Sequence, residues 1–137
     1  MNVNLTINVE GDYTEEEIAK KMFILGELII NKIKENIRAM DLIDSGQFLQ
    51  QWFSTYKNGE LTIENGQEYM IYLEYGTYAY WNQYGEENFP GTPDPKKKDL
   101  PASLRKNYPK GMQPFAFIRK VLYNDIIMAE LIQQAFS

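Results

Sequence analysis

The chain has 137 residues and a formal net charge of −5, with 44% hydrophobic and 24% charged residues. This length and balance predict one soluble globular domain, long enough to bury a core without covalent staples. Neither cysteine nor histidine occurs, which excludes disulfides, thiolate chemistry and every triad or general base that uses histidine. A metal site would have to use oxygen ligands.

The sequence also argues against membranes and nucleic acid as partners. No apolar run is long enough to span a bilayer, and the N-terminal residues lack a secretory pattern, so we expect the protein to stay in the cell that makes it. The one basic cluster, PKKKDLPASLRKNYPK, holds Lys96 to Lys110. In a chain of net negative charge such a run is typical of a solvated loop rather than a nucleic-acid surface.

The first 40 residues predict one strand and one long helix. Hydrophobic and polar residues alternate strictly over Val3–Val9, as in a half-buried strand. Thr14 and Glu17 have the spacing of a capping box, with Thr14 as the N-cap of a helix expected over about 15–40. Apolar residues at steps of three and four form one stripe along this helix. The stripe consists of Ile18, Met22, Leu25, Ile29, Ile33, Ile37 and Met40, and is widened by Phe23 and Ile30.

A hairpin is predicted next. Asp44, with Gln47 three residues on, has the pattern of an N-cap for a short helical turn. Aromatic residues and threonine favour an extended chain from Phe48 to Tyr56. Asn58-Gly59 is a strong hairpin signal, and the return strand is expected over Leu61–Glu64. We expect this hairpin to form a small antiparallel sheet with the first strand.

The rest of the chain predicts a short helix, a long loop and a second long helix. The short helix is expected over about 68–75, with Gly76 as its C-cap. No periodicity is evident over about 77–112, and so long a loop in a compact domain is usually functional or disordered. The last helix, with Pro114 in its first turn, is apolar over so wide an arc that we expect burial on two sides, the second against another subunit. Its two stripes are Phe115, Ile118, Leu122, Ile126, Ala129, Ile132 and Phe136, and Phe117, Val121, Met128, Leu131 and Ala135.

These elements together predict a single α+β domain over residues 1–137. We expect two long helices packed on a small antiparallel sheet, with a long aromatic-rich loop at about 77–112 before the last helix.

No motif predicts a catalytic or cofactor site. Neither G-x-G-x-x-G nor the P-loop pattern occurs. Ser45 has no histidine to activate it and is expected in a turn after a helix cap. The carboxylates of Glu15–Glu17 and Glu86–Glu87 are expected on solvated surface, because acid–base work needs a cleft that nothing marks. We therefore expect no enzyme activity, no cofactor and no metal.

The segment Tyr69–Phe89 is strongly aromatic, although its glycines and prolines indicate a loop. Tyrosine and tryptophan are enriched at protein interfaces because they bury a large area at small entropic cost. They also stack on sugars or nucleic-acid bases. We expect a protein interface rather than a ligand site. Tyr69, Tyr72 and Tyr75 are expected to face inward, and Tyr78, Tyr80, Trp81 and Tyr84 to be available to a partner.

Three motifs occur in the order DSGQFLQQW (Asp44–Trp52), YMIYLEYGT (Tyr69–Thr77) and MQPFAFIRKVL (Met112–Leu122). They resemble elements of the small neck or tail-completion proteins of long-tailed bacteriophages. In that family a D-T-G-x-L-like element follows a long first helix, and Y-A-x-x-V-E-[FY]-G-T and R-P-F-[LI] elements precede the last one. The resemblance covers roughly residues 14 to 136. This chain has Ser45 where threonine is usual and Gln113 where arginine is common.

The resemblance implies a structural virion protein that assembles into a ring at the head–tail junction and joins, completes or terminates the tail. The implied partners are copies of itself and neighbouring neck, connector or tail proteins, with DNA passing through the ring without sequence-specific binding. The implied location is the virion, after assembly in the host cytoplasm.

Residues for these roles follow from the same motifs. Glu74–Thr77 are expected to fix the geometry where the loop leaves the fold, and Pro114 and Phe115 to dock the last helix. The candidate assembly interface consists of Tyr75, Thr77, Tyr78, Tyr80, Trp81, Tyr84, Phe89 and Phe115.

Two other functions stay open. A binding module with an aromatic groove predicts a stable monomer that binds a sugar or peptide saturably. A magnesium-dependent hydrolase predicts stabilisation by metal and activity that requires Asp44 or Glu74.

Overall fold

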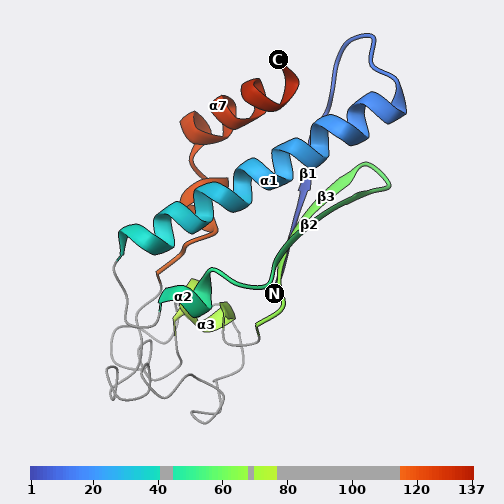
Figure 1. Ribbon diagram of the computed structural model, residues 1–137. Coiled ribbons are helices and arrows are strands. Elements are labelled where there is room, and N and C mark those ends of the chain that lie inside the picture. The colour runs from blue at the N-terminus through green and yellow to red at the C-terminus, as the bar shows by residue number, and fades with distance from the viewer. Residues whose placement is uncertain (41–44, 68–69, 77–114) are drawn as a thin grey trace, which may run out of the picture.

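The computed structural model describes residues 1–40, 45–67, 70–76 and 115–137, without the side chains of residues 45, 71 and 72. These residues form a mixed helix and strand fold with a three-stranded antiparallel sheet and five helices (Figure 1). In chain order the elements are β1 (Asn2–Thr6), α1 (Glu15–Ala39), α2 (Ser45–Phe48), β2 (Trp52–Lys57), β3 (Glu60–Asn65), α3 (Met70–Tyr75), α6 (Arg119–Leu122) and α7 (Asp125–Phe136).

Helix α1 forms the middle layer of the molecule (Figure 1). The sheet packs against one side of α1, and α7 runs along another. The last helix packs along α1, and the contact of its second side with another subunit stays a prediction. Helix α1 contacts both the sheet and α7, which explains why its buried stripe is broad. This stripe consists of Met22, Leu25, Gly26, Ile29, Ile30, Ile33 and Ile37.

The start of α1 confirms the predicted cap, because the Thr14 hydroxyl accepts a hydrogen bond of 3.1 Å from the backbone N–H of Glu17. The helix ends at Ala39, within one residue of the prediction. The assignment of Phe23 to the buried stripe was wrong, since 61% of this residue is exposed. Ile30, the other residue expected to widen the stripe, is buried.

The hairpin forms as predicted at Asn58-Gly59. Both residues have positive φ, 54° and 78°, as a type I′ turn requires. Strand β3 lies in the centre of the sheet, in the order β1-β3-β2, and Lys57 pairs with Glu60 next to the turn. The extended chain predicted from Phe48 begins only at Trp52, because Phe48 ends α2.

The first strand is shorter than predicted. Strand β1 ends at Thr6 rather than Val9. The alternation of exposed and half-buried side chains nevertheless continues to Val9. The pattern thus predicted which face each side chain takes, but not where pairing with β3 stops.

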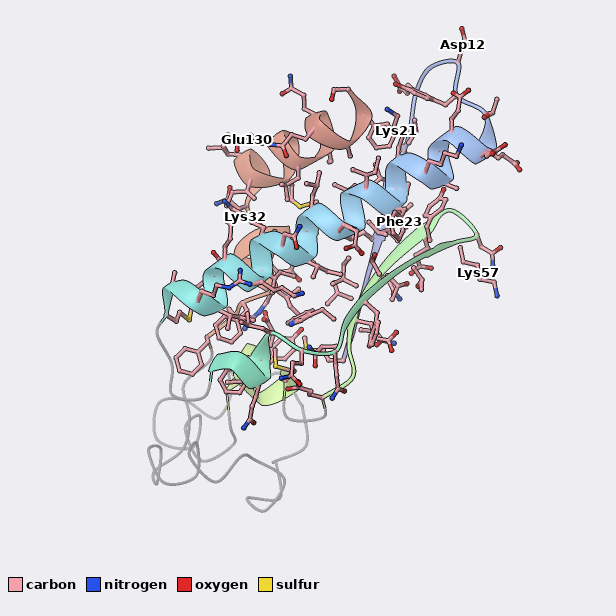
Figure 2. All side chains as sticks on the ribbon, viewed as in Figure 1. Asp12, Lys21, Phe23, Lys32, Lys57 and Glu130 are labelled. Atoms are coloured by element: carbon pink, nitrogen blue, oxygen red, sulfur yellow. The ribbon has the colours of Figure 1, made fainter. Side chains whose placement is uncertain are left out.

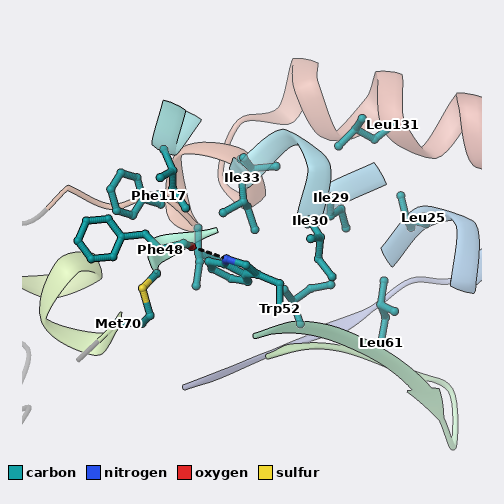
Figure 3. Close-up of a cluster of buried hydrophobic side chains, with 14 of the residues drawn as sticks. Leu25, Ile29, Ile30, Ile33, Phe48, Trp52, Leu61, Met70, Phe117 and Leu131 are labelled. Atoms are coloured by element: carbon teal, nitrogen blue, oxygen red, sulfur yellow. Dashed lines mark hydrogen bonds between the residues drawn. The ribbon is translucent and has the colours of Figure 1, made fainter. Parts of the chain in front are cut away.

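Aromatic side chains close the core at the end of the sheet near the N-terminus (Figure 3). The indole Nε1 of Trp52 donates a 2.7 Å hydrogen bond to the carbonyl of Phe48, which holds α2 against the start of β2. Phe48, Met70 and Phe117 are all buried in the same cluster, although they come from three separate segments. On the far side of α1, Leu131 of α7 joins the cluster.

The prediction of one long C-terminal helix starting at Pro114 was wrong. Pro114 itself lies outside the described residues, and Ala116 has φ of 52°, which no right-handed helix accommodates. After the single turn of α6, the side chain of Asn124 accepts a hydrogen bond of 3.1 Å from the N–H of Ile127 and caps α7. The helical segment is therefore divided in two, as expected for a residue type that competes for backbone donors.

Each predicted stripe is buried only in part, and Phe115 and Ile118 of the first stripe also lie in the core. Val121, Leu131 and Ala135, from the second stripe, lie in the core. Ile126, from the first stripe, is 74% exposed. Leu122, Ile132 and Phe136 pack only partly against the core.

We predict that Gly26→Ala destabilises the fold by about 1–2 kcal/mol. A Cβ at this position would lie 2.6 Å from Ser54 Oγ and 2.7 Å from Ser54 Cβ, so α1 and β2 would have to separate. This strain outweighs the gain of up to about 1 kcal/mol that alanine brings to a helix. Urea unfolding would measure the loss.

Two variants control this experiment. Ser54→Gly in the Gly26→Ala background removes the opposing Cβ and should recover stability. Gly46→Ala meets no atom within 4 Å and should be nearly neutral. A Gly26→Ala protein as stable as the parent would show that the helix and strand separate without cost.

Candidate functional site

Two segments far apart in sequence meet where the chain leaves and re-enters the described residues. We call them the loop junction: Leu73–Gly76 at the end of α3, and Phe115–Arg119 at the start of α6. The N–H of Phe115 donates a 2.7 Å hydrogen bond to the carbonyl of Leu73. The junction therefore brings together the LEYG and FAFIR parts of two motifs.

The carboxylate of Glu74 lies at the centre of the loop junction. Glu74 is only 1% exposed. Its Oε1 accepts a hydrogen bond of 2.7 Å from the N–H of Ile118, and its Oε2 accepts from the N–H and Nε of Arg119 at 3.1 Å and 2.7 Å. Such charge-assisted bonds compensate a carboxylate for the loss of water. They also supply the cap that Ile118, whose side chain makes no capping bond, does not give α6.

Arg119 is held from three directions. Besides the carboxylate, its Nη2 donates to the backbone carbonyl of Glu74. The guanidinium carbon lies 4.5 Å from the centre of the Tyr75 ring, in a cation–π contact. Arginine can serve all three partners at once because its donors lie in a planar fork.

Gly76 ends α3 with φ of 80°, a conformation that favours glycine over any L residue. This confirms the predicted C-cap. Gly76 is the last described residue before the segment 77–114, and it directly follows the residues that contact Arg119.

Phe115 is a core residue in this structure. Only 7% of it is exposed, and its ring stacks on that of Phe117 with centroids 5.8 Å apart and planes 8° apart. Its place next to Leu73 fits the docking role predicted for it at the start of the C-terminal helices.

Of the eight predicted interface residues, the structure describes only Tyr75 and Phe115, and brings both into the loop junction. The others lie outside the described residues, as do Asp44, Gln113 and Pro114. These others are Thr77, Tyr78, Tyr80, Trp81, Tyr84 and Phe89.

Sequence reasoning gave no role to Arg119, although it lies inside the third motif. A signal was available: Glu74 lies between apolar residues in a segment predicted to pack, and a carboxylate that is buried requires a positive partner. Only the fold could show which of the cations in the chain is that partner.

The contacts of Glu74 connect two parts of the fold. Both carboxylate oxygens accept hydrogen bonds from donors of residues 118 and 119. In the part of the chain that the structure describes, no group of three acidic residues is placed to hold a metal ion. None of the described helices is both long and apolar enough to cross a membrane.

In addition to Phe53 on β2, large apolar side chains are exposed at two places beside hollows of the described fold. On the sheet side of α1, a hollow of about 180 Å³ lies next to Phe23. At the break between α6 and α7, Tyr123 and Ile126 are 77% and 74% exposed, beside an open hollow of about 560 Å³. The first hollow is lined by Ala19, Phe23, Ser54, Thr55, Tyr56 and Leu61.

No protein-family model, curated protein or solved structure matches the chain. The resemblance to phage neck proteins is therefore an expectation that rests on the three sequence motifs alone.

We predict that Glu74→Gln destabilises the fold by about 3 kcal/mol, because the amide leaves Arg119 without its counter-charge in a partly buried place. Arg119→Lys should cost less, since it keeps the charge but loses the forked contacts and the stacking on Tyr75. Urea unfolding followed by circular dichroism would measure both.

The exposed ion pair of Lys20 with Glu16, at 3.6 Å, provides the matched control. Glu16→Gln should change stability by less than about 0.5 kcal/mol. If Glu74→Gln were as mild as Glu16→Gln, the loop junction would not depend on this carboxylate.

Proposed function

We propose that this chain is a structural subunit of a phage neck, which assembles into a ring and completes the tail or joins it to the head. The observation that carries the proposal is the convergence of all three motifs in one packed corner. Phe48 comes from the first motif, Glu74 from the second, and Phe117 and Arg119 from the third. Among the residues of the motif elements that carry the resemblance, Phe48, Glu74 and Phe115 help to hold this corner together.

Such a corner suits a protein whose work is assembly. The loop junction anchors both ends of the segment 77–114, at Gly76 and Phe115. Segments that bind partners are commonly carried by a rigid scaffold of this kind. The aromatic residues expected to contact neighbours, Tyr78 to Phe89, lie within that segment.

Two separate apolar surfaces provide further support. A ring needs heterologous contacts, in which one face of a subunit meets a different face of the next. Phe23 marks a surface on the sheet side of α1, and Tyr123 and Ile126 mark another near the start of α7. The net charge of −5 suits a ring through which DNA passes without adhering.

We predict that a stop codon in this gene abolishes infectious particles in the phage that carries it. Electron microscopy of the lysate should show DNA-filled heads separate from tails. Finished tails would identify joining or completion, and tails of uncontrolled length would identify termination.

Supplying the intact gene in trans should restore infectivity, which controls for effects on neighbouring genes. Normal infectious particles without the protein would overturn the proposal. The protein should then be tested as a monomer that binds a sugar or a peptide.

A further inference from the structure

Both edges of the sheet are open within the described residues. In the order β1-β3-β2, only β3 is paired on both sides. Strand β2 has the sequence WFSTYK, with no proline and with Lys57 as its single charge. Sheet edges in monomers are usually protected by charges, proline or bulges. An edge strand of this composition is a template for pairing.

The register shows which backbone groups face outward. Next to a two-residue turn, Lys57 and Glu60 form a hydrogen-bonded pair, so alternate residues of β2 turn their N–H and C=O groups away from β3. These residues are Trp52, Ser54 and Tyr56. On the other side of β3, Met1 and Asn65 exchange two bonds of 3.0 Å. It follows that Asn2, Asn4 and Thr6 face outward from β1.

This alternation matches a parallel junction between copies. The outward residues of β2 have side chains on the face covered by α1, whereas those of β1 have side chains on the opposite face. In an antiparallel pair, two residues that bond directly have their side chains on the same face. Pairing β2 with β1 in this way would therefore put α1 of the two copies on opposite sides of the sheet. In a parallel pair, each outward-facing residue bonds to the two neighbours of the residue opposite it, so α1 of every copy lies on the same side.

The side chains at the two edges are complementary as well. Leu61 and Ile63 of β3 are fully buried, but Val3, Leu5 and Ile7 are only half-buried. At the β2 edge, the hollow of about 180 Å³ is bounded by α1, β2 and Leu61. Figure 2 shows Phe23 on the side of α1 that faces the hairpin, and Lys57 at the hairpin tip. One edge thus offers apolar side chains and the other an apolar recess.

We propose that β2 of one copy pairs in parallel with β1 of the next, so that the sheets of the subunits join into one continuous sheet. The inference rests on the proposed ring, and it identifies a contact by which the ring is built. With the strands aligned as they lie within one subunit, Ser54 is opposite Val3 of the next copy, and Tyr56 is opposite Leu5. These apolar side chains then enter the recess beside Phe23.

Charge favours the same pairing. The outward-facing stretch of β1, from Asn2 to Thr6, carries no charge, and the chain beyond it carries exposed Glu10 and Asp12. A parallel neighbour brings Lys57 to this end of β1, where opposite charges attract. A two-fold pairing of β2 with β2 would leave the β1 edge open and could not continue into a ring.

Disulfide formation tests this contact directly, because the natural chain has no cysteine. In the aligned register, Thr55 lies opposite Asn4 of the next copy. Within one copy β3 separates these two residues, with Thr62 between them, at two strand spacings or about 10 Å. A disulfide needs Cα atoms closer than about 7 Å, so it can form only between copies.

The double variant Asn4→Cys with Thr55→Cys should give a ladder of linked species on a non-reducing gel, after mild oxidation of assembled particles. Asn2→Cys or Thr6→Cys in place of Asn4→Cys tests registers shifted by two residues. Each single variant should give no ladder. Dimers from Thr55→Cys alone would indicate two-fold pairing and overturn the inference.

The outcome separates the inference from the proposed function. Particles that contain the protein but give no ladder in any of the three registers would overturn the β2–β1 junction and leave the neck role intact. If the gene is dispensable and the protein is missing from particles, the neck role fails. A ladder from the purified chain would then still support the junction between copies.

Adding Phe23→Ser to the variant that carries Asn4→Cys and Thr55→Cys tests whether the recess contributes to the contact between copies. Because Phe23 is largely exposed, its loss should leave the thermal unfolding midpoint of the free chain nearly unchanged. It should lower the yield of linked species about tenfold, as expected for an aromatic anchor at an interface. Glu130→Ser is the control and should give the parent yield, because Glu130 is an exposed residue of α7 on the side of α1 away from the sheet (Figure 2). Equal yields from both variants would count against the recess.

Discussion

The carboxylate of Glu74 joins the two halves of this fold. It lies at the end of α3, yet its hydrogen bonds go to the backbone of Ile118 and Arg119, more than forty residues later in the chain. Without these bonds, nothing on α6 would satisfy the first N–H groups of that turn. The position of α6, and through it the path into α7 along α1, therefore depends on one buried negative charge.

That charge also gives the motifs a physical meaning. Tyr75 and Gly76 follow Glu74 directly, one stacking on the guanidinium of Arg119 and the other turning the chain away. In the same junction, the rings of Phe115 and Phe117 stack on each other. A group of residues that supports an ion pair and two chain directions has few acceptable substitutes, because each residue is constrained by the others.

Helix α1 imposes a second constraint. It packs against the sheet on one side and α7 on another, so it supplies more of the buried core than any other described element. One helix on the inner face of the sheet does not cover the edges of that sheet. The side chains of β1 therefore stay half-buried, and a recess stays open beside Phe23. The same surfaces become useful if copies of the chain complete one another.

Local chemistry made much of the fold predictable. The cap at Thr14, the period of α1, the Asn58-Gly59 turn and the C-cap at Gly76 were read correctly, because each depends on neighbours within a few residues. The C-terminal helix was misjudged for the opposite reason. Its apolar pattern is continuous, and the break comes from the conformation of Ala116, a bond to Leu73 and a cap at Asn124.

In the candidate site, too, some features follow from local sequence and others from tertiary packing. By itself the sequence determined that no histidine or cysteine chemistry is possible, and it marked the LEYGT and QPF segments as motifs of one resemblance. Only the tertiary structure decided that Glu74 pairs with Arg119 rather than another cation, that Phe115 is buried, and that Phe23 is exposed. Periodicity states which residues share a face of a helix. Whether another element covers that face depends on packing between segments far apart in the chain.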